Sequence, residues 1–472
     1  MTSIATILNQ NPSHAKIFNL SGEISAKIDI PSYVVGGYVR DALLNRDTND
    51  IDIMVEGDVI KFSNELAKSL NVKNIVEFPD FCTVLVPYSE INIHVASARK
   101  ESYKEKSRKP EVELCTIEED LSRRDFTINA MAASLMKENY GQIYDPFSGI
   151  KDLQKKILIT PLDPDTTFKD DPLRILRAIR FTAQLNFNLT SFIEDSIIKQ
   201  KTGLEFISKE RITEELVKIL KTEKPSVGLH LLKKLDLFPL VFPELDILGG
   251  VEIIDGKSHK DVFLHTLEVV DNAAKLSKKM EIRFAALVHD IAKPQTKKFY
   301  KNRGWTYYGH EELGQYIIKK IAKRMKISNQ LRDYLMLLTK LHLRPIALAK
   351  EGVSDSAVRR VMIEAGEHID DLMILCRADI TTKNTRKIDE YINNFNRVEK
   401  MIQDVTLRDE MSNFKIPITG QIIMKEFNLR PGREVGEIKN QIKDAIIDGL
   451  IQNNYDDAFE YMVKIKNKKI KN

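Results

Sequence analysis

Apolar residues in the first hundred positions recur with two periods, one typical of strands and one typical of helices. Runs rich in valine and isoleucine predict strands at Val34–Val35, Ile51–Val55, Thr83–Val86 and Ile91–Ala96. Helical spacing predicts helices at Tyr38–Leu44 and Val59–Leu70. Strands that alternate with helices predict a small mixed sheet covered on one face, which is an α/β domain.

The pattern becomes helical after this domain. Residues 188–243 have helical spacing, and Lys209–Leu220 predicts one amphipathic helix within them. Two prolines within Leu237–Leu245 interrupt this spacing and indicate a domain boundary. Residues 386–410 predict a charged helix, and the last nine residues, KIKNKKIKN, predict a disordered basic tail. The chain is therefore expected to be predominantly helical overall.

Composition indicates the class of protein but does not distinguish between functions. A length of 472 residues predicts three or four domains, and 43% hydrophobic with 30% charged residues is typical of a soluble globular protein. Cys82, Cys115 and Cys376 are too few and too scattered for a disulfide framework, which predicts a cytoplasmic protein. No apolar run reaches membrane-spanning length. A net charge of +4 is small for a nucleic-acid-binding protein, so RNA would have to be held by local patches.

The glycine pair Gly36–Gly37 stands between the first predicted strand and helix. Glycine allows a tight turn and leaves no side chain between the backbone and a ligand. The free N–H groups and positive dipole end of the following helix lie beside this turn, so the arrangement can hold a phosphate. Arg40 adds a forked cation in the first helical turn.

Asp50 and Asp52 stand two residues apart on the second predicted strand. Side chains at this spacing point to the same face, roughly 7 Å apart, and two such carboxylates repel unless a cation lies between them. Magnesium prefers carboxylate and phosphate oxygens. The alternative is a hairpin tip with two solvated aspartates, but the glycine turn directly upstream favours a phosphoryl-transfer site.

The segments GGYVRD and NDIDIMV together resemble the catalytic core of the class II tRNA nucleotidyltransferase and poly(A) polymerase family, within the polymerase-beta-like superfamily. The resemblance implies a nucleotidyltransferase head in which Asp50 and Asp52 hold catalytic Mg²⁺. It also implies that Gly36, Gly37 and Arg40 bind the nucleotide. Relatives often have a third acid on a later strand, where the segment INIHVASAR places His94 in this chain. The predicted metal site therefore has two carboxylates.

Two further segments of the head fit this resemblance. Arg99–Thr116 is charged and aperiodic, which is typical of a solvated connector. The family has a flexible loop here, and its full length favours complete CCA addition. In Asp120–Ala132 the apolar spacing predicts a packed helix. Arg123, Arg124 and Asp125 could form a surface salt-bridge cluster, whereas the resemblance places them around the sugar and phosphates of the nucleotide.

The segment FKDDPLRILRAIRF predicts the start of a helix, because Asp171 can cap it and Pro172 suits its first position. Arg174, Arg177 and Arg180 then recur at every third residue. By pattern alone this is a cationic helix face that rests on RNA or solvent.

Base chemistry gives this helix a sharper interpretation. Cytosine and adenine both place an amino donor beside an unprotonated ring nitrogen, so an aspartate beside an arginine fits them and mismatches uracil and guanine. The family has its protein template here, in the motif E-D-x-x-R, and this chain has Asp170 where glutamate is usual. The resemblance implies that Asp171 and Arg174 choose the base, with Arg177 and Arg180 in support.

A second constellation follows residue 250. Histidines and aspartates appear in the order expected for the HD phosphohydrolase superfamily, over about residues 255–385, at His265, His289, Asp290, His310, His342 and Asp379. Neutral imidazoles and carboxylates suit one or two transition-metal ions such as Mn²⁺ or Ni²⁺. A lone histidine on a helix is usually a packing residue, and a fused HD domain can lack activity. Six residues in this order favour a metal site.

We therefore expect an α/β nucleotidyltransferase head (residues 1–160), followed by an all-α neck (161–245), HD domain (246–400) and tail with a basic end (401–472). The expected activity is template-independent addition or repair of the 3′-terminal CCA of tRNA from CTP and ATP with Mg²⁺. A metal-dependent phosphohydrolase activity is expected in the HD domain. The alternatives are a poly(A) polymerase or A-adding enzyme, and a chain whose main activity is phosphohydrolysis. The expected partners are tRNA, CTP and ATP, without a membrane or an obligate protein partner.

Overall fold

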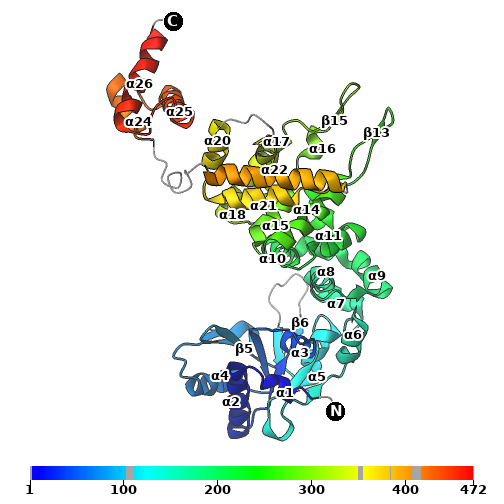
Figure 1. The fold of residues 1–472 in the computed structure, drawn as a ribbon. Helices are drawn as coiled ribbons and strands as arrows, with labels where there is room; N and C mark the ends of the chain where they lie inside the picture. The colour runs from blue at the N-terminus through cyan, green and yellow to red at the C-terminus, as the bar shows by residue number, and fades with distance from the viewer. Residues whose placement is uncertain (1–2, 103–110, 349–354, 383, 405–415, 471–472) are drawn as a thin grey trace. The chain divides into compact units, whose positions relative to one another are not determined.

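A computed structural model describes residues 3–102, 111–348, 355–382, 384–404 and 416–470 (Figure 1). The chain divides into two compact units, one of Met1–Ile219 with Val227–Phe242 and one of Leu220–Ser226 with Pro243–Asn472. None of the helices within the described ranges combines the length and apolarity that crossing a membrane requires. The predicted limits of the four domains remain predictions.

The head is built on a seven-stranded mixed sheet in the order β3-β4-β5-β2-β1-β8-β9. Its strands are β1 (Ser32–Val35), β2 (Asp50–Val55), β3 (Val76–Phe78), β4 (Thr83–Tyr88), β5 (Ile91–Ser97), β8 (Ala132–Ser134) and β9 (Ile143–Tyr144). Only the pairing of β2 with β5 is parallel among these neighbours, which makes the sheet mixed as predicted. The four strands predicted from apolar runs are all present.

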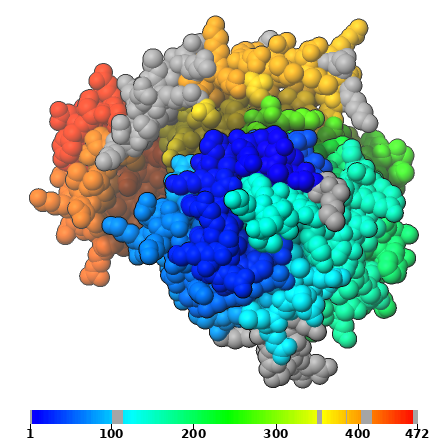
Figure 2. Space-filling model, turned by 90° about the horizontal axis from the view of Figure 1, so that it is seen from below, coloured from blue at the N-terminus to red at the C-terminus, as the bar shows by residue number. Residues whose placement is uncertain are grey.

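The helices of the head are α1 (Ala5–Leu8), α2 (Pro12–Ile28), α3 (Gly37–Leu43), α4 (Val59–Ser69), α5 (Ile117–Ser122) and α6 (Gly149–Lys155). Among them, α2, α3 and α4 pack on the strands of this sheet. Phe18 of α2 and Phe62 of α4 are fully buried. In the space-filling view, the blue N-terminal residues lie against a cyan segment of the head, consistent with the 2.8 Å hydrogen bond from Ile4 N to Gly141 O (Figure 2).

Two predictions for the head need correction. The stretch from Asp120 to Ala132 is not one packed helix, because α5 ends at Ser122 and a single 3₁₀ turn covers Thr127–Asn129 before β8. Pairing of β8 with the central strand β1 overrides the helical spacing. The segment predicted as an aperiodic loop begins and ends in an antiparallel pair, β6 (Arg99–Ser102) with β7 (Glu111–Leu114), and the intervening residues lie outside the described ones.

A run of helices follows the head. They are α7 (Pro164–Asp170), α8 (Leu173–Leu185), α9 (Ser191–Gln200), α10 (Lys209–Leu220), α11 (Pro225–Lys234), α12 (Phe238–Val241) and α13 (Pro243–Asp246). Helix α8 begins at Leu173, one residue later than predicted, while the Asp171 side chain accepts a hydrogen bond from Leu173 N at 3.1 Å. A short parallel pair, β10 (Ile157–Leu158) with β11 (Asn188–Leu189), was not predicted.

The second unit is mainly helical, as predicted. Its larger helices are α14 (Val262–Leu276), α15 (Met280–Val288), α17 (His310–Arg324), α18 (Asn329–Leu341), α20 (Asp355–Ala365), α21 (Ile369–Ala378), α22 (Thr385–Asp404), α24 (Gly420–Phe427), α25 (Arg433–Ile447) and α26 (Tyr455–Ile470). Two short helices, α16 (Lys293–Thr296) and α19 (Arg344–Leu348), accompany them. Helix α26 includes most of the basic end that was predicted to be disordered.

Two small antiparallel hairpins interrupt this helical unit and were not predicted. One pairs β12 (Ile253–Ile254) with β13 (Lys257–Ser258), and the other pairs β14 (Lys298–Tyr300) with β15 (Gly304–Thr306). The apolar spacing of such short strands is too brief to distinguish them from loops.

Candidate active sites

The glycine turn of the head lies between β1 and α3. Gly36 has φ of 68° and its N–H donates to Met131 O at 3.0 Å, which ties the turn to the segment before β8. A Cβ atom on Gly36 would lie 2.8 Å from Nη1 of Arg124. Arg124 therefore lies against the turn and would have to shift for a larger residue, while the backbone angle itself requires glycine at this position.

The two predicted carboxylates lie on β2, next to the parallel strand β5. Asp50 is exposed and Asp52 is partly buried, and the sheet register places His94 beside Asp52. Burial raises the pKa of the Asp52 carboxyl, and this effect outweighs the opposite effects of Arg124 and His94. A carboxylate that its surroundings compensate incompletely, with a second one on the same face, has the donor set and charge that suit a divalent cation.

Asp120 fixes both arginines of the RRD segment (Arg123–Asp125), and Asp120 was not predicted as a site residue. Its buried carboxylate accepts from Arg123 Nη2 at 2.6 Å and from Arg124 Nη2 at 3.0 Å, with one oxygen for each arginine. Burial alone would raise the pKa of Asp120, but the two guanidinium groups outweigh it and lower the pKa. The paired arginines are thus not a loose surface cluster, because an ionised carboxylate orients both of them.

A chain of polar side chains connects the glycine turn with helix α8. Arg40 donates to both oxygens of Asp41 at 2.9 and 2.7 Å and to Oδ1 of Asn129 at 2.7 Å. The Asn129 amide donates to Asp125 Oδ1 at 2.9 Å, and Arg177 Nε donates to Asp125 Oδ2 at 2.7 Å. Arg40 is buried and each of its guanidinium nitrogens makes one of these bonds, and its predicted contact with a nucleotide remains a prediction.

Phe181 lies at the centre of this network. The guanidinium carbons of Arg40, Arg177 and Arg180 lie 5.1, 5.5 and 4.0 Å from its ring centroid. Phe126 meets the same ring edge-to-face at 5.8 Å. Arg177 and Arg180 belong to α8 itself, so the contacts of Phe181 that join α8 to the head are those with Arg40 and Phe126.

The residues predicted to choose the base occur at the start of α8. Arg174 Nη2 donates to the backbone oxygen of Arg123 at 2.6 Å, so the RRD segment and the predicted template helix meet. Asp171 Oδ2 accepts from Arg211 Nη2 at 3.1 Å. Asp171 and Arg174 are both partly exposed, and their role in base recognition remains a prediction.

The other arginines of α8 do not form a cationic face that rests on solvent. Arg180 is buried and its Nε donates to Glu215 Oε2 of α10 at 2.7 Å. Arg177 is held by Asp125 as described above. Residues three apart on a helix differ in direction by about 60°, so Arg174 and Arg180 point about 120° apart and the three arginines meet different partners.

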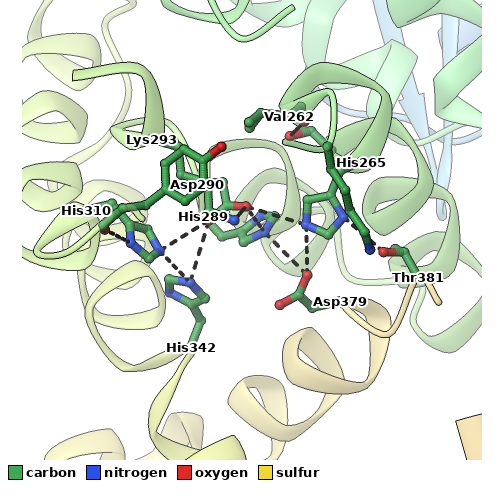
Figure 3. Close-up of polar contacts among 12 residues, drawn as sticks. Val262, His265, His289, Asp290, Lys293, His310, His342, Asp379 and Thr381 are labelled. Atoms are coloured by element: carbon green, nitrogen blue, oxygen red, sulfur yellow. Dashed lines mark hydrogen bonds and ion pairs between the residues drawn. The ribbon is translucent and has the colours of Figure 1, made fainter. Parts of the chain in front are cut away.

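The histidines and aspartates predicted for the HD domain lie at or next to the ends of helices. His265 lies in the first turn of α14, and His310 begins α17. His289, His342 and Asp379 directly follow α15, α18 and α21, where the negative ends of the helix dipoles favour a cation. All six predicted residues lie close together (Figure 3).

The ligand atoms form two adjoining groups, each within 4.8 Å. One group contains His265, His289 and Asp379, with His265 Nε2 2.9 Å from Asp379 Oδ1. The other contains Asp290, His310 and His342, with the two Nε2 atoms 3.3 Å apart. Asp290 joins the groups, because its Oδ2 lies 3.2 Å from His289 Nε2 and its Oδ1 lies 3.3 Å from His310 Nε2.

Each histidine is oriented by its second ring nitrogen. In His289, His310 and His342, Nδ1 lies 2.6–2.8 Å from the backbone oxygen three residues earlier. In His265, Nδ1 lies 3.0 Å from Thr381 Oγ1. A backbone oxygen can only accept, so in His289, His310 and His342 the proton of the neutral ring lies on Nδ1 and Nε2 faces the centre, as in metal sites.

The polar atoms in the centre fit divalent cations. His289 Nε2 and Asp290 Oδ1 are buried without a hydrogen-bond partner. Burial, followed by the nearby His289, lowers the pKa of His342 to about 4, so His342 is a neutral imidazole at neutral pH. Burial would also lower the pKa of His265, but hydrogen bonds to Asp290 and Asp379 outweigh it and raise the pKa to about 9. Two carboxylates and four imidazoles are a donor set for transition metals.

Several site residues were missed by the sequence analysis. Asp120 and Phe181 carry no motif of their own, and their roles depend on contacts between distant segments. Lys293, whose Nζ lies 2.5 Å from Asp290 Oδ2, follows Asp290 by three residues in the sequence. That helical spacing was the one available signal for Lys293.

Family models match three parts of the chain. Residues 32–159 match a poly A polymerase head domain, residues 186–248 match a probable RNA and SrmB-binding site of polymerase A, and residues 262–384 match an HD domain. These ranges contain, respectively, the glycine turn with the two aspartates, helix α10, and the histidine cluster.

Similar proteins include two curated relatives. The chain is 32% identical to a multifunctional CCA protein of Shewanella frigidimarina over 364 residues, which cover 74% of this chain and 83% of the relative. It is 40% identical to an A-adding tRNA nucleotidyltransferase of Aquifex aeolicus over 206 residues, which cover 43% of this chain and 24% of that protein.

Solved structures share the fold. A Bacillus stearothermophilus CCA-adding enzyme in complex with CTP matches with a TM-score of 0.70 and 19% identity, over 98% of this chain and 100% of that one. A Thermotoga maritima CCA-adding enzyme complexed with tRNA matches with a TM-score of 0.59 and 21% identity, over 98% of both chains.

Proposed function

Because the chain belongs to the class II tRNA nucleotidyltransferase and poly(A) polymerase family and carries a fused HD domain, we propose that it adds or repairs the 3′-terminal CCA of tRNA from CTP and ATP. The observation that carries this proposal is the position of Asp50 and Asp52 on one strand, beside the turn on which Arg124 rests. Carboxylates for a metal and cations for phosphates thus lie side by side.

The parts of the head have distinct roles in this proposal. Asp50 and Asp52 would hold Mg²⁺, which supplies positive charge to the attacking and leaving oxygens of a phosphoryl transfer. Arg123 and Arg124, oriented by Asp120, would hold the triphosphate and the sugar. Asp171 and Arg174 would present an acceptor and a donor to the base. Arg177 would fix the position of α8 through its bond to Asp125.

Replacing either carboxylate tests the proposal. Asp50→Ala or Asp52→Ala should abolish nucleotide addition, because losing one metal ligand costs several kcal/mol at the transition state. Binding of tRNA, measured by filter retention, should remain nearly unchanged. Asp47→Ala, which removes an exposed carboxylate from the loop before β2, is a matched control that should keep full activity. Addition by an Asp50 or Asp52 variant within tenfold of wild type would contradict the assignment.

An A-adding enzyme is the second candidate function. The A. aeolicus A-adding relative is more similar within its matched segment, at 40% identity, than the S. frigidimarina relative is over its longer match. Such an enzyme would extend a tRNA that already ends in CC and would not use CTP.

For the HD domain we propose a metal-dependent phosphohydrolase. His265, His289 and Asp379 would hold one ion and Asp290, His310 and His342 a second, with Mn²⁺ or Ni²⁺ suited to these ligands. Ions held there would act as Lewis acids toward a phosphate ester. Lys293 extends toward the same centre and would balance the charge of the ester.

Metal analysis tests this second site separately from the first. Substituting His289→Ala and Asp290→Ala together should remove bound transition metal and phosphate release while CCA addition continues. His368→Ala, a partly exposed histidine in the same unit, is the matched control and should keep the metal. Equal metal content in the double variant and the wild type would rule the site out.

A further inference from the structure

A buried histidine of the head, His14 on α2, has no role in the function proposed above. It is 4% exposed, and its ring meets the rings of Phe18 and Tyr38 edge-to-face at 6.3 and 5.7 Å. Nδ1 lies 3.1 Å from the Tyr38 hydroxyl, whereas Nε2 is buried without a hydrogen-bond partner among the residues that the structure describes. Burying an unpaired polar atom costs free energy, so this histidine requires an explanation.

Helix α2 fixes the place of His14 because it is tied to the sheet. Ser25 Oγ of α2 lies 2.6 Å from Ser32 Oγ of β1. A Cβ atom on Gly22 would lie 2.2 Å from Leu135 O, so the backbone of α2 lies directly against the segment after β8. Helix α2 therefore cannot move His14 without losing contacts with the sheet.

Tyr38 connects His14 with the glycine turn. It is the second residue of α3, directly after Gly37, and is 6% exposed. On the other side of the turn, the N–H of Gly36 is bonded to the segment before β8, and the Arg124 guanidinium lies over Gly36. The turn is thus held at one end by the sheet and at the other by the bond between His14 and Tyr38. A shift of Tyr38 would move the surface against which Arg124 lies.

The charge of the His14 ring decides whether this contact is favourable. A hydroxyl can donate or accept, so either neutral tautomer of His14 can bond Tyr38. In the imidazolium both nitrogens carry a proton, and Nε2–H would place a charge and a second donor where the described residues offer no acceptor.

The groups around His14 do not compensate such a charge. Burial lowers the pKa of the His14 ring. Helices α1 and α4 and strand β1 also pack on α2, and burial rather than a charge on these elements is the cause of the shift. Burial, followed by Tyr140, raises the pKa of Tyr38 to about 12, so the Tyr38 hydroxyl stays neutral.

We propose that His14 is a positioning residue of the head, which holds the glycine turn through Tyr38 while its ring is neutral and no longer holds it when the ring is protonated. The proposal rests on the proposed nucleotidyltransferase function and adds a regulation by pH to the same site. Protonation favours any state in which the ring reaches water. The contact is therefore fully present above the ordinary histidine pKa of about 6.5 and is lost as the pH falls below it.

Hydrogen exchange of the α3 amides measures this contact without a nucleotide. The full-length wild type is compared by mass spectrometry with His14→Phe, which keeps an aromatic ring and removes the titrating group, at about pH 7.5 and about pH 5.5. After correction for the intrinsic exchange rates, protection of α3 should fall by up to roughly tenfold more in the wild type, because the lower pH is about one unit below the ordinary pKa. Equal pH dependence of the two proteins would overturn the proposal.

Calorimetric titration with CTP and Mg²⁺ tests what the contact does for binding. At neutral pH, His14→Phe and Tyr38→Phe should each raise the Kd of CTP by roughly twofold to tenfold, which is the effect of one lost hydrogen bond, while kcat stays within about twofold. The double variant should bind no more weakly than the weaker single variant, because both changes remove the same bond. Additive losses would contradict this bond as the cause.

Two further variants separate positioning from folding. His14→Asn keeps a polar group near the place of Nδ1 but does not titrate, so it should restore most of the affinity for CTP and show the smaller pH dependence of His14→Phe. Asn19→Ala changes an exposed residue of the same helix and should behave as the wild type in both measurements. A loss of affinity in His14→Asn as large as in His14→Phe would show that the ring only fills space.

The two measurements separate this inference from the function on which it rests. If the wild type binds no CTP but α3 shows the predicted pH dependence, the nucleotidyltransferase proposal fails and the role of His14 at the turn stands. If the wild type binds CTP and adds nucleotides, while α3 of the wild type and of His14→Phe responds equally to pH, the function stands and the role of His14 is wrong.

Discussion

Gly36 has both an unusual backbone conformation and a close contact with the Arg124 side chain. Its backbone has φ of 68° and ψ of −124°, which side chains rarely adopt, and the space above it belongs to the Arg124 guanidinium. Gly37, the next residue, is helical, and a Cβ there would only touch Arg40 Nη2 at an ordinary 3.6 Å. The two glycines look equivalent in the sequence but differ in what the fold requires of them.

Alanine at each glycine tests this difference. Gly36→Ala should lower the free energy of unfolding by about 1–3 kcal/mol through backbone strain and should displace Arg124. We expect kcat/KM for CTP to fall at least tenfold. Gly37→Ala, the matched control, should change the free energy of unfolding by no more than about 0.5 kcal/mol. Equal stability of the two variants, measured by chemical denaturation, would refute the distinction.

At the scale of elements, helix α8 connects the parts of the head and neck. Its buried face carries Leu176 and Ile179, its first turn meets the RRD segment through Arg174, and Arg180 meets α10. A helix fixed at several points can hold a base-reading edge at a constant distance from the carboxylates. This rigidity is what a protein template needs in place of a nucleic-acid template.

The predicted template residues should affect choice of nucleotide more than rate. Arg174→Ala removes the donor to the ring nitrogen and Asp171→Ala removes the acceptor for the amino group. Each good contact to a base edge is worth about 1–3 kcal/mol, so preference over UTP and GTP should fall roughly tenfold to a hundredfold. Asp195→Ala, which removes an exposed carboxylate from α9 outside this motif, is the control and should keep wild-type preference.

Folding must be checked for Asp171→Ala, because the lost cap on Leu173 N costs about 1 kcal/mol. Circular dichroism and thermal unfolding show whether α8 survives. If both folded variants keep the wild-type preference and lose only overall rate, α8 does not read the base.

Sequence reasoning worked best where a local pattern is sufficient. The strands with Asp50 and Asp52, helix α10 and the order of the HD residues are all visible along the chain. It failed where distant segments decide the outcome. Asp120–Ala132 has helical spacing, yet the following strand β8 pairs with β1. Asp120 forms ion pairs with both Arg123 and Arg124. The two small hairpins and the arrangement of the histidines and aspartates in two groups likewise follow from tertiary contacts, which no single stretch encodes.

The whole chain contains two chemical centres in two compact units. The first unit places Asp50 and Asp52 on a strand near Arg124, and the second gathers histidines at helix ends around a buried aspartate. Each centre has its own supporting contacts. We therefore expect a variant of one centre to leave the activity of the other unchanged.

The most direct measurement of the central claim is the length of the product formed on a tRNA that lacks CCA. The purified chain with Mg²⁺ should add two nucleotides from CTP alone, a third when ATP is also present, and none from UTP or GTP. Full product should require both nucleotides. If CTP extends nothing while ATP extends a tRNA that ends in CC, the chain is an A-adding enzyme, and the assignment of complete CCA addition is wrong.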